Sequence, residues 1–161
     1  MTTLHHGLAR QLTEAIGAAP DARAAMELTV ERLKTQLPFY SWVGIYLLEG
    51  GELVLGPFLG KPSPHTRIPL DRGICGAAAS TRSTIIVDDV NADPRYLACS
   101  LDTKSEIVVP IMAGEVVLGE IDIDSDTPAA FGLDDRALLE AVADALALRL
   151  RRSDGPEIMG S

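Results

Sequence analysis

The segment 115–124 constrains the fold most strongly, because its second half alternates acidic and apolar residues. Successive side chains of an extended strand point to opposite faces. One face of this strand carries three carboxylates: Glu120, Asp122 and Asp124. The other face carries Ile121 and Ile123, which predicts a strand with one apolar side. Like charges on one face repel each other unless a cation binds there or water solvates them. From the residues alone, both interpretations stay open.

Further strands are predicted by short apolar runs at 42–48, 52–58, 84–87 and 107–112. Glycine-containing turns join two pairs of strands into hairpins, around Gly50-Gly51 and around Ala113-Gly114. We interpret 60–76 as mostly loop, with a short helix opening near Cys75, and 91–104 as polar and irregular.

Helical periodicity brackets these strands. Leucines and an isoleucine recur every four residues in 1–18, and a single apolar stripe runs through 22–37, ending at Pro38. Asp134 is the predicted N-cap of a last helix from Asp135 to about Arg152. We therefore expect one α+β domain over 1–161, with five or six mostly antiparallel strands, a core at about 20–152, and a disordered tail at 153–161.

Composition excludes several classes of protein. The 161 residues include 14 basic and 23 acidic side chains, for a net charge of −9, whereas a nucleic-acid binder needs a basic face. No apolar run reaches the ~18–20 residues of a membrane span, and the first residues lack a signal-peptide core. Two cysteines are too few for a disulfide scaffold, so we expect reduced thiols and a cytoplasmic location.

The side chains with the greatest chemical potential are the two cysteines and a histidine. Cys99 lies in a polar loop, where a thiol is accessible and can be reactive, whereas Cys75 is expected to pack beneath a turn. His65 is expected to be exposed in its loop, as are His5 and His6 near the start. A zinc site formed by His65, Cys75, Cys99 and a carboxylate is conceivable, but the spacing does not call for one and no metal is expected.

Several motifs, in order along about 38–150, together resemble the free methionine-(R)-sulfoxide reductases, which are single GAF-domain enzymes. The motifs are Ser41-Trp42-Val43-Gly44-Ile45-Tyr46, Leu53-Val54-Leu55-Gly56-Pro57-Phe58, Gly60-Lys61-Pro62, Arg72-Gly73-Ile74-Cys75-Gly76, Ala98-Cys99, Ser105-Glu106-Ile107-Val108-Val109-Pro110 and Ile121-Asp122-Ile123-Asp124-Ser125. The resemblance implies a GAF-like fold: a central antiparallel sheet with the terminal helices on one face and the loops of a ligand pocket on the other.

The resemblance also implies reduction of free L-methionine-(R)-sulfoxide to methionine. By motif position, Cys99 matches the catalytic cysteine. The pocket carboxylates match Glu106, Asp122 and Asp124, and the aromatic wall matches Trp42 and Tyr46. In this chemistry a thiolate attacks the sulfoxide, an acid supplies a proton, and the resulting sulfenic acid is converted to a disulfide that thioredoxin or another thiol reduces. The carboxylates would bind the substrate ammonium, and one of them, kept protonated, would serve as the acid.

This chain departs from the family at the usual third cysteine, where it carries His65. Either Cys75 acts as the resolving thiol, or an external thiol clears the sulfenic acid directly. Two other functions remain open: a GAF module that senses a small amino-acid-like ligand, and a redox sensor that uses Cys75 and Cys99. By analogy with other GAF domains, the terminal helices are expected to pair two copies into a homodimer.

Overall fold

The computed structural model describes residues 2–98 and 102–158, and side chains as far as Arg151. Its centre is a six-stranded sheet in the order β3-β2-β1-β6-β5-β4, with every adjacent pair antiparallel. The strands are β1 Trp42–Glu49, β2 Glu52–Leu59, β3 Arg67–Pro69, β4 Ile85–Val87, β5 Ser105–Ala113 and β6 Val116–Ser125. The sheet and its helices confirm the predicted α+β class.

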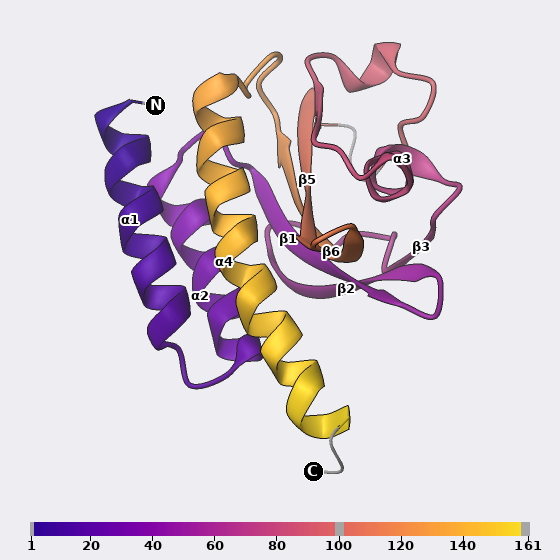
Figure 1. Cartoon of the computed structure of the whole chain (residues 1–161). Coiled ribbons are helices and arrows are strands. Elements are labelled where there is room, and N and C mark those ends of the chain that lie inside the picture. Colours follow the sequence, from indigo (N-terminus) through magenta and orange to yellow (C-terminus); the bar gives the residue numbers. More distant parts are fainter. Residues whose placement is uncertain (1, 99–101, 159–161) are drawn as a thin grey trace.

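Three helices form a layer on one face of the sheet, as Figure 1 shows: α1 Thr3–Ala18, α2 Ala22–Gln36 and α4 Leu133–Ile158. A fourth helix, α3 Gly73–Thr81, lies on the opposite face (Figure 1). The first two helices start at side-chain caps, since Thr2 accepts a hydrogen bond from the His5 amide and Asp21 accepts one from the Ala24 amide. The terminal helices therefore lie on one face, as the sequence predicted.

Helix α4 differs from its prediction at both ends. It starts at Leu133, and Asp135, not Asp134, reaches back to accept a hydrogen bond from the Gly132 amide at 2.9 Å. A carboxylate three residues into a helix can bond the cap amide in this way, which the choice of Asp134 overlooked. The helix continues to Ile158, into the segment expected to be disordered, because each added residue extends an existing ladder of backbone hydrogen bonds.

His5 is not exposed as predicted. Its Nε2 lies 3.1 Å from Asp135 Oδ1, so the imidazole joins α1 to the first turn of α4. The Tyr40 hydroxyl donates to the same carboxylate oxygen at 2.7 Å. Proximity in the fold, across 130 residues of sequence, explains the difference; His6 is exposed, as expected.

The two faces of the sheet have different compositions. The helix face packs against α2 and α4, on which α1 packs in turn. This face is apolar: Val43, Ile45, Ile107, Val109, Ile121 and Ile123. The site face is turned toward α3 and carries the aromatic and acidic residues: Trp42, Tyr46, Glu106, Glu120, Asp122 and Asp124. Within the described parts of the chain, no helix is both long and apolar enough to cross a membrane.

Candidate active site

Strand register brings the predicted site residues of the sheet together. Asp124 of β6 is paired with Trp42 of β1 on one side and with Glu106 of β5 on the other. Two residues along β6, Asp122 is paired with Gly44 and Val108. The next site-face position of β6 is Glu120, which is paired with Tyr46. The acid cluster, defined as Glu106, Glu120, Asp122 and Asp124, therefore spans two adjacent strands on one face.

The acid cluster is buried, which excludes the interpretation as a solvated face. The exposed fractions of Glu106, Glu120, Asp122 and Asp124 are 5%, 0%, 2% and 3%. Burial disfavours the charged form of each carboxyl group and raises its pKa, most clearly for Glu106, Glu120 and Asp124. Glu120 was noted in the alternating strand but not assigned to the site; its place on the same face as Asp122 was the signal that could have assigned it.

Hydrogen bonds within the acid cluster act on the pKa of Glu106 and on those of its two aspartate neighbours in opposite directions. Burial, the charges of Asp122 and Asp124 and hydrogen bonds to both raise its pKa, whereas the same hydrogen bonds lower the pKa of the two aspartates relative to burial alone. These hydrogen bonds therefore favour the protonated form of Glu106 and the charged form of each aspartate.

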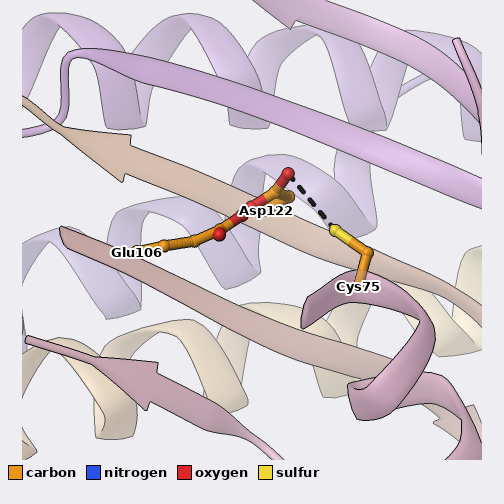
Figure 2. A group of neighbouring side chains, drawn as sticks. All are labelled: Cys75, Glu106 and Asp122. Atoms are coloured by element: carbon orange, nitrogen blue, oxygen red, sulfur yellow. Dashed lines mark hydrogen bonds between the residues drawn. The ribbon is translucent and has the colours of Figure 1, made fainter. Parts of the chain in front are cut away.

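Cys75 faces this cluster from the opposite layer. It lies in the first turn of α3, is 5% exposed, and its Sγ is 3.4 Å from Asp122 Oδ2 (Figure 2). Burial raises the pKa of the Cys75 thiol well above its ordinary value, and the nearby Asp122, Glu120 and Glu106 raise it further. The expected packing beneath a turn is thus what the structure has, and the group is a neutral thiol.

The aromatic wall lies beside the acids and is held by backbone carbonyls. The Trp42 indole donates from Nε1 to the Lys61 carbonyl at 2.9 Å and stacks on Phe58, with 5.8 Å between ring centroids. Its ring lies directly over Gly44, where an added Cβ would come within 2.3 Å of the indole. The Tyr46 hydroxyl donates to the His65 carbonyl at 2.7 Å.

The strap, defined as residues 60–66, provides both of those carbonyls. Its side chains also reach the segment that precedes β5: His65 Nε2 is 3.0 Å from the Ala98 carbonyl, and Lys61 Nζ is 2.6 Å from Asp102 Oδ2. His65 is therefore half-buried and bonded, in contrast to the exposed histidine expected from its loop. The predicted nucleophile, Cys99, lies outside the described residues.

Two small cavities open onto the site. One, of about 20 Å³, is lined by residues of the acid cluster and of the segments that face it, including Tyr46, His65, Cys75, Leu97, Glu106 and Asp122. The other, of about 70 Å³, lies between Trp42, Lys61, Thr103 and Asp124. Both are far smaller than the ~300 Å³ typical of a ligand pocket.

Among the described residues, one group could hold a metal ion: Cys75, Glu106 and Asp122. It differs from the zinc set considered from the sequence, because His65 is absent and two carboxylates are present. Three ligands from α3, β5 and β6 have no sequence spacing that could reveal them.

Comparison with known proteins identifies the class of protein to which this chain belongs. A family model described as the GAF domain matches residues 21–150, and the chain is a GAF-domain protein. It is 31% identical over 160 residues to the free methionine-R-sulfoxide reductase of Escherichia coli (strain K12), covering 99% of this chain and 96% of that one.

Two solved structures of free methionine-R-sulfoxide reductases are similar to this chain over most of its length. The type II free methionine-R-sulfoxide reductase of Thermoplasma acidophilum is 40% identical, with a TM-score of 0.79 over 88% of this chain and 96% of that one. The free methionine-R-sulfoxide reductase of Neisseria meningitidis, solved with its substrate, is 36% identical, with a TM-score of 0.88 over 93% and 90%. The chain belongs to the free methionine-R-sulfoxide reductase family of GAF-domain proteins.

Proposed function

We propose that this protein reduces free L-methionine-(R)-sulfoxide to methionine. The observation that carries the proposal is the buried acid cluster beside an aromatic wall. Among the described residues, no hydrogen bond or ion pair joins the cluster to a lysine, arginine or histidine. Buried carboxylates without a cation are costly, so a ligand that brings an ammonium group is favoured there. Family membership identifies a free amino acid as that ligand.

The cluster would divide two tasks between its members. Asp122 and Asp124 accept the substrate ammonium, since their hydrogen bonds with Glu106 favour the charged form of each. Glu106 holds the proton and delivers it to the sulfoxide oxygen as the S–O bond weakens. Trp42 supports the S-methyl group, because contacts between sulfur and aromatic rings are favourable. Tyr46 completes the wall.

Cys99 is proposed as the nucleophile. Its thiolate attacks the sulfoxide sulfur, the oxygen is transferred to the cysteine as a sulfenic acid, and methionine leaves. A second thiol then displaces water from the sulfenic acid and forms a disulfide. A further thiol, from thioredoxin or a small molecule, reduces that disulfide and returns Cys99 to its starting state. The protein itself supplies no bound cofactor in this scheme.

The second thiol is proposed to come from outside the chain. Cys75 is buried, its pKa is raised, and its thiol donates a hydrogen bond to Asp122. A buried neutral thiol is a poor nucleophile. His65 occupies the strap where the family's third cysteine is expected, so the strap offers no thiol. The need for a thiol reductant is in keeping with action in the cytoplasm.

The test is release of methionine from the free R epimer, with the S epimer as control, in dithiothreitol and separately with a thioredoxin system. Turnover of R alone, lost in Cys99→Ser, is expected. Cys75→Ser should keep turnover with both reductants; loss of the thioredoxin-linked cycle alone would make Cys75 the resolving thiol. Absence of turnover in folded, reduced protein would contradict the proposal and favour a ligand sensor. Rapid oxidation of Cys99 by peroxide in that case would favour a redox sensor.

A homodimer is proposed as the assembled form. Helices α1 and α4 lie side by side and leave three leucines exposed: Leu4, Leu133 and Leu148. Burying such side chains against a second copy would be favourable. Sedimentation velocity should show a dimer that Leu148→Glu shifts toward monomer. A monomer at all concentrations would contradict it.

A further inference from the structure

Three potential metal ligands converge on one point of the site from three different elements. Cys75 comes from α3, Glu106 from β5 and Asp122 from β6, and Figure 2 shows their side chains turned toward one another. One ligand atom from each lies within 4.8 Å of the others, and all three residues are buried. The rigid sheet and the helix above it hold the donors in place, so the set exists without a ligand.

The spacing suits a small tetrahedral cation. Zinc binds cysteine sulfur at about 2.3 Å and carboxylate oxygen at about 2.0–2.2 Å, which places two of its ligands roughly 3.5 Å apart. Cys75 Sγ and Asp122 Oδ2 are 3.4 Å apart. Glu106 offers a carboxylate oxygen within 4.8 Å of a ligand atom of each of the other two. A thiolate with two carboxylates selects a borderline cation such as zinc over magnesium or calcium, which prefer oxygen alone.

Unsatisfied oxygens around the three ligands point independently to a cation. Asp122 Oδ1 and Asp124 Oδ1 accept no hydrogen bond within the described part of the chain, and neither oxygen of the fully buried Glu120 does so with ordinary geometry. Glu120 nevertheless lies close enough to Cys75 for each group to affect the pKa of the other. Buried polar atoms are normally paired, so these oxygens are available to coordinate a cation.

The cavity beside these ligands is matched to an ion in size. Its volume of about 20 Å³ exceeds the ~10–15 Å³ that one water molecule requires. The cavity therefore has room for a single metal ion.

We propose that Cys75, Glu106 and Asp122 form a binding site for a thiophilic divalent cation of the zinc class, and that this cation competes with the substrate. A water molecule would complete the tetrahedron. On binding, Cys75 releases its thiol proton and Glu106 its carboxyl proton to solvent; nothing is oxidised or reduced. Under the proposed function Asp122 also accepts the substrate ammonium, so the cation and the substrate compete for this carboxylate and the cation acts as an inhibitor. Competition rests on that function, but metal binding does not.

Cobalt provides the direct probe, because cobalt bound to a thiolate gives a sulfur-to-metal charge-transfer band in the near ultraviolet. We expect this band when Co²⁺ is added to the protein in a non-thiol reductant, and its loss when Zn²⁺ is added afterwards. Cys75→Ser should abolish the band. Cys99→Ser is the matched control and should retain it. A band that survives Cys75→Ser, or that disappears only in Cys99→Ser, would overturn the proposal, as would the absence of any band in the unmodified protein.

A second measurement separates this proposal from the proposed function. Zinc affinity is measured by competition with a chromophoric chelator, and Glu106→Gln should weaken it at least tenfold while circular dichroism confirms the fold. If Glu106→Gln does not fold, Asp122→Asn replaces it. Added methionine should raise the apparent Kd for zinc in proportion to its concentration. Zinc affinity that is unaffected by methionine would overturn the competition and leave both metal binding and the reductase to be judged by their own tests.

Discussion

The two faces of one β-sheet use the same backbone alternation for opposite purposes. On β6, Ile121 and Ile123 are fully buried against the helix layer, where apolar contact stabilises the fold. Their neighbours Glu120 and Asp122 are equally buried on the other side, where burial is unfavourable for a charged carboxyl group. The apolar contacts of the helix face therefore stabilise the fold enough to offset the unfavourable burial of ionisable groups on the site face.

The largest effect is expected on the helix face. Ile121→Ala removes a fully buried side chain from the apolar cluster and should lower the free energy of unfolding by about 2–5 kcal/mol. Folded protein should retain its kcat/KM, because the side chain points away from the site. Urea denaturation and steady-state kinetics measure both. Val116→Ala, on the exposed start of the same strand, is the control and should change neither; a loss of activity in folded Ile121→Ala would break the comparison.

The corresponding change on the site face should lower activity without lowering stability. Asp122→Asn keeps the size of the side chain but removes its charge, so kcat/KM for the free R epimer should fall about 100-fold, or roughly 2.7 kcal/mol of transition-state stabilisation. The free energy of unfolding should stay the same or rise. Asp144→Asn, exposed on α4, serves as the control. Loss of stability with unchanged kinetics would assign Asp122 to the fold instead.

Stability should depend on pH through the site face. Burial raises the pKa of Glu106, Glu120 and Asp124, so the folded protein keeps protons that the unfolded chain has already released. From the ordinary carboxyl range up to these raised values, the free energy of unfolding therefore falls as pH rises. We therefore expect the free energy of unfolding to decrease between pH 5.5 and pH 8, as the raised pKa values of these buried carboxyl groups require.

A variant identifies the groups responsible. Glu120→Gln should flatten the pH dependence, whereas Glu115→Gln, exposed at the turn before β6, should leave it intact. Stability that rises with pH over this range would contradict the burial of protonated acids.

The smallest effect is expected from two tyrosines on opposite faces. The Tyr40 hydroxyl donates to Asp135 beside the helix layer, and the Tyr46 hydroxyl donates to the His65 carbonyl in the strap. Tyr40→Phe and Tyr46→Phe should each lower the free energy of unfolding by about 1 kcal/mol. Only Tyr46→Phe should also raise KM by a few-fold, because the strap helps to form the pocket. Equal kinetic effects in both variants would remove the distinction between the faces.

Sequence patterns predicted the two faces but not the environment of the second. Alternation along β6 separates Ile121 from Asp122 in the same way whether the acidic side is exposed or covered. Its burial depends on α3 and the strap, which lie far away in the chain, and Cys75 meets Asp122 across 47 residues. The bond from His5 to Asp135 and the role of Asp135 at the start of α4 escaped notice because both require tertiary contacts.

The resemblance to known motifs supplied what periodicity could not. It grouped Trp42, Tyr46 and Glu106 into one pocket, and the strand register then brought them together in space. Glu120 was left out, although it shares its face with Asp122. The chemistry of a buried site depends on side chains from different helices and strands that come into contact in the fold. Local sequence patterns do not indicate those contacts.

The most direct measurement of the central claim is a comparison of two substrates in the same enzyme. The free (R) epimer carries an ammonium group for the buried carboxylates, whereas its N-acetyl derivative carries none. If the site face is built to bind that charge, kcat/KM for the N-acetyl compound should be lower by at least 100-fold, and Asp122→Asn should narrow the gap. Equal kcat/KM for the two substrates would contradict the claim that the buried carboxylates bind the substrate ammonium.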